Sequence, residues 1–478
     1  MYLKGGYAVE QHKKIMFIDL DKKNSESLAA IDSSGMSITY GGLLDFADEW
    51  KDSIHSRSLI LIIGDNTIGG IAGYIGSMIH KIVPIIVGVG IKDEALNHLK
   101  STYKPQFIWK PRNLLSSNEK EVFEKYDYVL VENEKVGYPL YDDLCLLLTT
   151  SGSTGSPKLV RHRYLNLEAQ ARNISRFFEL DSADRPLVSL PIQYTMAISS
   201  INSHLYVGAT LLLTSMSLLS PDLWTFVKTE RATSITGVPY SFELMYKLRI
   251  YRQDIPSLKL LTQGGGKLDK TIQITFAEYI QKKGGKYIAT YGQTEGSARM
   301  AYLPNEYAIS KCGSIGKAIP NGKLYIVDEA GNEVKQAGKI GEMVFEGDNV
   351  TLGYAENGSD LIRGDDNKGV LHTGDLVYKD DDGFFFIVGR KKRFLKLYGH
   401  RVSLDECEQL IKNKYKIECA CTGTDKMLKI YITDKEYEDC VKKYILSETE
   451  LYANSITVIC IESIPKNEAG KTLYAQLD

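Results

Sequence analysis

The segment 146–158 combines residue types that suit the binding of phosphates. It reads LLLTTSGSTGSPK, so an apolar run that predicts a strand leads into hydroxyls and glycines and ends at Lys158. Glycines let backbone N–H groups approach a phosphate closely, hydroxyls donate further hydrogen bonds, and a lysine supplies positive charge. The pattern indicates a phosphate-binding loop, and its alternative interpretation is a mobile Ser/Gly surface loop.

Two segments that end in lysine depart from the Walker P-loop motif, which requires GxxxxGK[ST]. Pro157 stands where the second glycine should precede Lys158. In the second loop, which ends at Gly470 and Lys471, Pro465 replaces the first glycine. The sequence therefore disfavours a P-loop kinase.

The loop 150–158, TSGSTGSPK, resembles the phosphate loop of the adenylate-forming superfamily, which contains acyl-CoA synthetases, luciferases and nonribosomal-peptide adenylation domains. Further signatures of that superfamily follow in the family's order. They are YGQTE at 291–295, GE at 341–342 through GY at 353–354, HTGD at 372–375, GR at 389–390, KLYG at 396–399 and PKNEAGK at 465–471. The resemblance covers the chain from about residue 30 onwards and is closest in type to stand-alone bacterial AMP-forming ligases.

This resemblance implies an enzyme that activates a small carboxylic acid with ATP to an acyl-adenylate, releases pyrophosphate, and passes the acyl group to a thiol. The implied cofactors are ATP and Mg²⁺, and the implied acceptor is coenzyme A or the phosphopantetheine of an acyl or peptidyl carrier protein. Three alternatives stay open: an amino-acid-activating enzyme that loads a carrier protein, a ligase that stops at the adenylate or uses a non-thiol acceptor, and a non-catalytic nucleotide-binding protein. The last requires a damaged Lys471, Glu295 or Asp375, and all three are present.

The resemblance assigns particular residues to ATP. Asp375 is similar to the aspartate that accepts both ribose hydroxyls, which suits the two acceptor oxygens of a carboxylate. Thr294 resembles the threonine that bonds the α-phosphate, and Glu295, with Thr154, is expected to hold Mg²⁺. A turn-stabilising aspartate and a solvated glutamate are the alternatives. The expected nucleotide-binding residues are Thr150, Ser151, Gly152, Ser153, Thr154, Gly155, Lys158, Gly265, Gly266, Tyr291, Gly292, Gln293, Thr294, Asp375, Arg390, Lys396 and Lys471.

Lys471 is the expected catalytic residue of the first step, together with Thr294 and Glu295. Negative charge builds up as a carboxylate attacks the α-phosphate and pyrophosphate leaves, and an ammonium between the two anions stabilises that transition state. The PxxxxGK spacing at 465–471 matches the family. Without that match, Lys471 would be interpreted as a solvated lysine.

The resemblance also implies a lid that adopts two poses, with Lys471 inserted for adenylation and withdrawn for attack by the thiol. Lys392 occupies the hinge position, where a residue absorbs the backbone rotation. A plain basic linker is the alternative interpretation. In the second pose the strand that carries Lys396 and Gly399 is expected to face the site, and Gly399 leaves space for a pantetheine arm.

The acid pocket is implied to lie between the segments 190–197, 237–241 and 296–298. Amino-acid-activating members carry an aspartate in the first segment to pair with the α-ammonium, and none occurs at 193–196, so a free α-amino acid is disfavoured. The aromatic and thioether side chains favour a short acyl, hydroxyacyl or aryl acid, although they could be ordinary core residues. The expected pocket residues are Tyr194, Met196, Tyr240, Gly264 and Gly296.

Alternating apolar and helical segments must position these residues, which predicts an α/β fold. The runs Leu59–Ile63 and Ile82–Val87 flank a glycine-rich helical segment and predict a βαβ unit buried on both faces. We expect a large N-terminal domain of layered βα subdomains at 1–389, with a small β-rich subdomain at about 323–389. A hinge at 390–392 then leads to a small mobile α+β lid at 393–478.

The composition is that of an ordinary globular enzyme. Lysine and arginine total 58 against 60 aspartate and glutamate residues, so no charge excess indicates a nucleic acid or membrane partner. The seven cysteines form no pair of CxxC elements that predicts a zinc site and are expected to be reduced thiols. Charged residues interrupt the apolar stretch 58–90, so no membrane span is predicted, and the N-terminal region lacks a secretory pattern. A cytoplasmic location is expected.

Overall fold

The computed structural model describes residues 17–149, 158–397, 400–424, 426–449, 451–467 and 470–477. The side chains at 392, 396, 400 and 401 lie outside that description. The predictions for Thr150, Ser151, Gly152, Ser153, Thr154, Gly155 and Gly399 fall outside the described residues, as do those for the side chains of Lys392 and Lys396.

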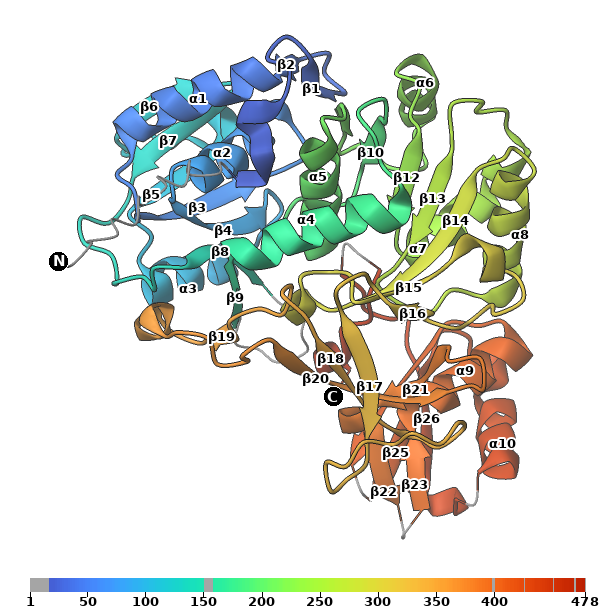
Figure 1. Cartoon of the computed structure of the whole chain (residues 1–478). Coiled ribbons are helices and arrows are strands. Elements are labelled where there is room, and N and C mark those ends of the chain that lie inside the picture. The colour runs from blue at the N-terminus through green and yellow to red at the C-terminus, as the bar shows by residue number, and fades with distance from the viewer. Residues whose placement is uncertain are drawn as a thin grey trace, which may run out of the picture.

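Two large sheets dominate the N-terminal part of the chain (Figure 1). The first has eight strands around a parallel centre. In spatial order they are β19 (Tyr354–Ala355), β9 (Leu159–Arg163), β8 (Leu144–Thr149), β4 (Val83–Gly88), β3 (Leu59–Gly64), β5 (Phe107–Pro111), β7 (Tyr128–Glu132) and β6 (Glu121–Lys125). Its helices are α2 (Ile68–Ile79) and α3 (Asp93–Tyr103). The predicted βαβ unit is confirmed as β3, α2 and β4, with β3 and β4 parallel.

The second sheet has nine strands, and several predicted site residues lie at or just after the ends of β13 and β14. Its order is β16 (Lys317–Ala318), β15 (Ala301–Leu303), β14 (Lys286–Tyr291), β13 (Leu260–Gln263), β12 (Ser234–Gly237), β10 (Pro186–Val188), β11 (Leu211–Leu213), β1 (Leu28–Asp32) and β2 (Ser37–Thr39). The remaining helices of this part are α1 (Tyr40–Ser53), α4 (Tyr164–Phe178), α5 (Thr195–Val207), α6 (Pro221–Thr229), α7 (Pro239–Lys247) and α8 (Lys270–Gln281).

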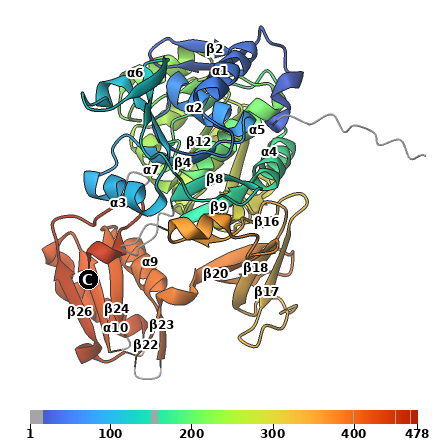
Figure 2. The same ribbon diagram turned by 90° about the vertical axis from the view of Figure 1, so that its left-hand side faces the viewer.

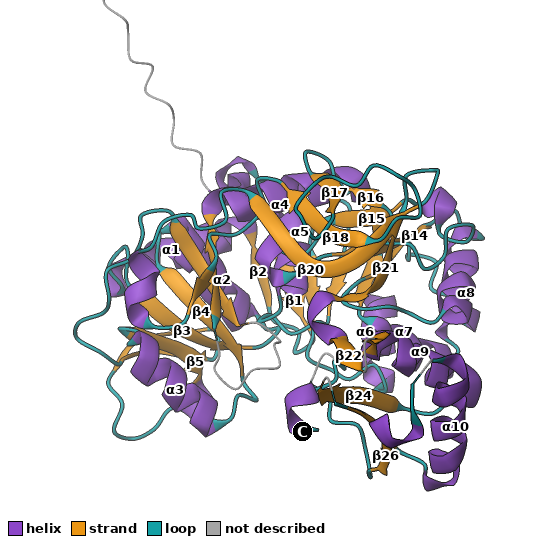
Figure 3. Cartoon of the chain, turned by 90° about the horizontal axis from the view of Figure 1, so that it is seen from below, coloured by secondary structure: helices purple, strands orange, loops and turns teal. Residues whose placement is uncertain are grey.

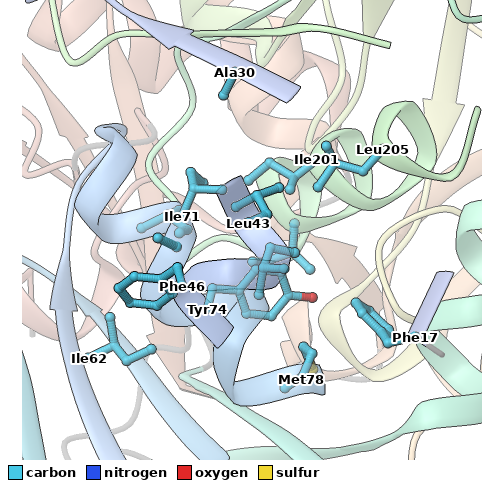
Figure 4. Packing of buried hydrophobic residues seen from close by; sticks show 14 of the residues in the cluster. Phe17, Ala30, Leu43, Phe46, Ile62, Ile71, Tyr74, Met78, Ile201 and Leu205 are labelled. Carbon is cyan, nitrogen blue, oxygen red and sulfur yellow. The ribbon is translucent and has the colours of Figure 1, made fainter. Parts of the chain in front are cut away.

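The core between the two sheets is built from α1, α2 and α5 together with β1 and β3 (Figure 4). Glycines on α2 allow this packing, because a Cβ at Gly73 would lie 2.4 Å from the indole of Trp109. Trp109 in turn meets Trp50 of α1 edge-on, with ring centroids 4.7 Å apart. The glycines of α2 therefore allow the helix to approach the sheet closely.

A four-stranded antiparallel sheet follows, confirming the β-rich texture expected from residue 323. Its strands are β17 (Lys323–Val327), β18 (Gly341–Glu346), β20 (Val370–Lys379) and β21 (Phe385–Arg390). In Figure 2 this sheet and the C-terminal elements lie side by side beneath the two large sheets.

The C-terminal part has its own hydrophobic core, formed by residues between 395 and 458. Helices α9 and α10 pack together and against the three-stranded sheet β24–β25–β26 (Figure 3). The elements are β22 (Phe394–Leu397), β23 (His400–Ser403), α9 (Leu404–Tyr415), β24 (Cys419–Thr424), β25 (Met427–Ile432), α10 (Glu438–Glu448) and β26 (Ile456–Cys460). The α/β fold class with a smaller C-terminal unit is confirmed, whereas the boundaries at 389 and 393 stay a prediction.

Three observations on cysteines, metal-binding side chains and membrane-spanning helices apply to the described residues only. The seven cysteines are free, and the described ranges contain no group of three metal-binding side chains. Within the same ranges no helix is long and apolar enough to cross a membrane.

Candidate functional site

The structure brings Tyr291, Gln293, Asp375 and Arg390 together from three separate segments. The Tyr291 hydroxyl donates to Asp375 Oδ2, and Gln293 Nε2 donates to the same oxygen at 2.9 Å. Arg390 Nε lies 3.4 Å from the other oxygen, Oδ1. Asp375 is buried, and burial raises its pKa while the charge of Arg390 lowers it. The site therefore holds one buried carboxylate with partners on both oxygens.

An irregularity in the four-stranded sheet aims Asp375 inward. The register between β18 and β20 shifts between Glu342 and Val344, and Gly374 adopts a positive φ of 70°. The Thr373 hydroxyl donates to the Met343 carbonyl at 2.7 Å and accepts from the Asp375 N–H at 3.1 Å. Bulges of this kind redirect side chains at functional sites.

Glu295 lies on a single 3₁₀ turn, Thr294–Gly296, directly after β14. Its Oε1 accepts a hydrogen bond from the Tyr354 hydroxyl at 2.6 Å. The ammonium of Lys158 lies 4.9 Å from the centroid of the same Tyr354 ring. Tyr354 thus connects the residue that ends the predicted phosphate loop with the predicted metal ligand.

Lys471 reaches the same site from the C-terminal part of the chain. The residue keeps an exposed surface, but surrounding protein desolvates its ammonium and lowers its pKa. The positive charge of Arg390 lowers that pKa further and Glu295 raises it, so both side chains lie within electrostatic range. The loop is shaped by Asn467, whose Oδ1 accepts from the Lys471 N–H at 2.9 Å.

Gly470 provides the contact that seats this loop on the N-terminal part. Its φ is 72°, a region that favours glycine. A Cβ at this position would lie 2.7 Å from the Cβ of Tyr240. Tyr240, predicted to line the acid pocket, therefore contacts the loop that carries Lys471 and remains 43% exposed.

The predicted pocket residues Met196 and Gly264 are neighbours. A Cβ at Gly264 would lie 2.9 Å from Met196 Sδ and 2.8 Å from Thr290 Oγ1. Gly265 is close to the Met196 methyl group, and Gly266 packs beside Pro239. The glycine-rich segment thus passes between the start of α5 and the end of β14.

The segment predicted to act as a hinge is bonded to Asp405 at the start of α9. Its carboxylate accepts from the Arg390 N–H at 3.2 Å and from Arg393 Nε at 2.5 Å. Arg393 also donates to Glu408 at 2.7 Å and lies over the ring of Tyr474 at 3.8 Å. Lys392 lies in the 3₁₀ turn Lys391–Arg393, so its backbone sits between two residues that are bound to the C-terminal part.

Sequence reasoning missed the roles of three residues in this region. Tyr354 was noted only as part of a signature, and Arg393 only as part of a basic linker. Arg299 drew no attention because it precedes the apolar strand β15, yet it is fully buried and donates to Ser199 Oγ at 2.7 Å. An arginine inside an otherwise apolar stretch is the signal that could have found it.

The sequence matches the family of AMP-binding enzymes over residues 22–355. It is 28% identical over 360 residues to 4-coumarate–CoA ligase 3 of Oryza sativa subsp. japonica, covering 70% of this chain and 64% of that protein. It is 25% identical to 2-succinylbenzoate–CoA ligase of Bacillus licheniformis, covering 70% and 66%, respectively. It is 29% identical to oxalate–CoA ligase of Arabidopsis thaliana over 58% of this chain and 54% of that protein. The chain thus spans less than two thirds of the length of these relatives.

Solved structures share the fold over nearly the whole chain. O-succinylbenzoate coenzyme A synthetase (MenE) from Bacillus subtilis in complex with AMP superposes with a TM-score of 0.78 at 19% identity, covering 96% of this chain and 97% of that one. ATP-bound MatB from Rhodopseudomonas palustris gives 0.76 at 19% identity, covering 97% and 98%. At this identity the likeness establishes the fold.

Proposed function

Because the chain belongs to the AMP-binding enzyme family, we propose that it activates a small carboxylic acid with ATP and transfers the acyl group to a thiol. The observation that carries the proposal is the loop of Lys471, which contacts Tyr240 of the N-terminal part through Gly470 and brings Lys471 within electrostatic range of Glu295 and Arg390. A cation delivered from a separate unit to a site with a buried carboxylate suits a reaction between two anions.

ATP binding is proposed to use the Asp375 cluster. A buried carboxylate offers two acceptor oxygens to the ribose hydroxyls, and Arg390 contributes a second, charged anchor at the edge of the site. Tyr291 and Gln293 hold the carboxylate in place through Oδ2. The ribose therefore meets an acceptor whose orientation is fixed before it binds.

In the first step a carboxylate oxygen of the acid attacks the α-phosphorus of ATP, and the bond from the α-phosphorus to the β-phosphate bridging oxygen breaks. Pyrophosphate leaves and an acyl-adenylate remains. Lys471 is proposed to stabilise the negative charge that develops on both partners, and Thr294 to hydrogen-bond the α-phosphate.

Glu295 is the proposed ligand of Mg²⁺, which supplies charge neutralisation at the ATP phosphates. A hard carboxylate oxygen suits this ion, which binds proteins through one or two carboxylates and otherwise through phosphates and water. The Tyr354 hydroxyl at 2.6 Å orients the Glu295 carboxylate for that task.

In the second step the sulfur of a thiol attacks the acyl carbon, the bond from that carbon to the AMP oxygen breaks, and AMP leaves. With Lys471 proposed to act in the site during the first step, the C-terminal part must rotate to admit the thiol. We propose Lys392 as the hinge and the strand with Lys396 and Gly399 as the surface that replaces Lys471. Coenzyme A is the proposed acceptor because the relatives are named CoA ligases, and a carrier-protein phosphopantetheine would present the same thiol.

Acid-dependent exchange of labelled pyrophosphate into ATP tests the first step. We expect exchange with one class of small acids, and formation of AMP and a thioester when coenzyme A is added. ATP binding without exchange for any acid would favour the non-catalytic alternative. Exchange without thioester would favour a ligase that stops at the adenylate.

A further inference from the structure

Arg299 is a buried cation without an acidic partner among the described residues. It is 1% exposed. Its Nη1 donates to Ser199 Oγ at 2.7 Å, and its guanidinium lies 5.0 Å from the ring of Phe178. Its Nε and Nη2 make no hydrogen bond within the described part of the chain. Burial alone lowers its pKa to about 9, and no carboxylate counters that effect.

Two other arginines with little exposed side-chain surface, one buried and one partly buried, are paired with carboxylates. Arg161, with a fully buried side chain, donates to Asp366 at 2.6 Å and to backbone carbonyls including that of Leu352. Arg393 is paired with Asp405 and Glu408. Arginine stays protonated at neutral pH, and a buried charge without a partner is strongly unfavourable. Arg299 therefore departs from the rule that the same chain follows elsewhere.

The backbone before Arg299 is strained in a way that directs its side chain inward. Ser297 and Ala298, two successive residues that are not glycine, adopt positive φ angles of 49° and 80°. The turn is held by Asn349, whose Nδ2 donates to the Gly296 carbonyl at 2.7 Å, and by Gln170, which donates to the Ser297 carbonyl. Strain of this kind persists at ligand sites because the surroundings over-determine it.

A chain of hydrogen bonds connects Arg299 with the predicted acid pocket. Ser199 accepts from the guanidinium and donates to the Met196 carbonyl at 2.7 Å. Met196 Sδ borders Gly264, as described above. Ser199 lies less than one turn after Met196 on α5, which corresponds to about 5 Å along the helix. The guanidinium is thus linked through Ser199 to Met196, whose side chain borders the glycine-rich segment.

Neutral polar groups surround this position. Helix α5 buries Thr195, Ser199, Ser200, Asn202, Ser203 and His204. Burial lowers the pKa of His204 to about 4, opposed by the Ser200 carbonyl and Asp184 and assisted by the charge of Arg299, so this histidine is neutral and within electrostatic range of Arg299. Ser297 Oγ and His204 Nε2 are buried and make no hydrogen bond among the described residues. The region offers polar groups to an anion, and the carboxylate of Asp184 lies within electrostatic range of His204.

We propose that Arg299 binds a second anionic group at the far end of the acid, so that the preferred substrate is a dicarboxylate. Nε and Nη2 carry parallel N–H groups along one edge of the guanidinium, the arrangement that binds a carboxylate through both oxygens. The unreacted carboxylate supplies the missing counter-charge, while the other carboxylate faces ATP. This inference rests on the proposed function.

Matched acids test the inference by pyrophosphate exchange. Each dicarboxylate from oxalate to suberate is compared with its monomethyl ester and with the monocarboxylate of equal length. The native protein is expected to prefer one dicarboxylate by about 100-fold or more in kcat/KM. Arg299→Met is expected to abolish that preference, Ser199→Ala to weaken it, and the exposed Arg172→Met on α4 to leave it intact.

Thermal unfolding separates a substrate-binding role from a structural one. Removing a buried charge that lacks a partner is expected to leave the unfolding midpoint of Arg299→Met unchanged or higher. A midpoint several degrees lower, or a variant that does not fold, would assign the guanidinium to the core and overturn the inference. Equal exchange with mono- and dicarboxylates in the native protein would also overturn it while leaving the proposed function intact. Silence with every acid would reject the proposed function itself, and the inference with it.

Discussion

The two halves of the candidate site differ in how far the protein satisfies its own polar groups. In the nucleotide half, Asp375 is bonded by Tyr291 and Gln293 and faces Arg390. In the half proposed to bind the acid, Arg299 is buried, and Ser297 Oγ and His204 Nε2 make no hydrogen bond within the described residues. One network is complete without a ligand, and the other lacks a counter-charge.

The difference follows from what each half is proposed to bind. An acceptor for ribose works best when its orientation is fixed before the ligand binds. The negative charge of Asp375 is balanced by Arg390, so fixing this carboxylate leaves no unpaired charge. A cation that binds a carboxylate at the far end of the acid cannot also be paired with a carboxylate of the protein, because it would then no longer bind the acid. Unsatisfied buried groups in a native structure therefore indicate the ligand that completes them.

Lys471→Ala is expected to have the largest effect, since Lys471 is proposed to stand between ATP and the acid. Adenylation should fall by about 10²–10³-fold, the usual loss when one preorganised stabilising group is removed. Reaction of a supplied acyl-adenylate with thiol should be largely retained, which single-turnover assays of each step can measure.

The matched control is Lys466→Ala, on the same loop, where the lysine pairs with Glu418 at the surface. Equal loss of both steps in Lys471→Ala would reject its placement between the two halves.

Asp375→Ala probes the nucleotide half alone. Loss of a charged acceptor should reduce kcat/KM for ATP by roughly 10–100-fold, because hydrogen bonds to charged groups contribute more than neutral ones. The ratio of kcat/KM between dicarboxylate and monocarboxylate should not change. Asp381→Ala, in the exposed turn of the same sheet, serves as the control. A changed acid ratio would show that the two halves are not independent.

Much of the nucleotide half could be predicted from the sequence, whereas the acid half could not. Asp375, Glu295 and Lys471 stand in short strings that resemble the superfamily's signatures, and their roles stay proposals. The proposed role of Arg299 could not be predicted from a signature string. It depends on the absence of a carboxylate beside the guanidinium, which only the packing of α4 and α5 reveals.

Long-range pairing explains the remaining gaps in the fold. The βαβ unit at 59–88 was predictable from local apolar runs. The joining of β1 with β11, whose strands are distant in sequence, had no local signal. The roles of Lys392 and Gly399 stay proposals based on the family resemblance.

The two halves should also differ in how much a substitution changes the free energy of unfolding. Tyr291→Phe removes a donor to a buried carboxylate and is expected to lower the free energy of unfolding by about 1–3 kcal/mol. Ser297→Ala removes a hydroxyl that has no hydrogen-bond partner among the described residues, so its effect should stay within about 0.5 kcal/mol. Urea unfolding of both variants measures the two values. Similar losses would remove the contrast between the halves.

The smallest predicted effect concerns pH. Burial and the charge of Arg390 lower the pKa of Lys471, so its ammonium loses the proton at a lower pH than an ordinary lysine. Adenylation should therefore decline as the pH rises through that lowered value. Lys471→Arg, which stays protonated, should flatten the alkaline limb at a reduced rate. An unchanged alkaline limb in this variant would assign the decline to another group.

The most direct test of the account follows oxygen from the acid. With a carboxylate labelled with ¹⁸O, attack on the α-phosphorus places one labelled oxygen in the AMP that leaves when the thiol attacks. The account predicts that AMP acquires one labelled oxygen per turnover, measured by mass spectrometry. Unlabelled AMP, or label in inorganic phosphate with formation of ADP, would contradict the acyl-adenylate route.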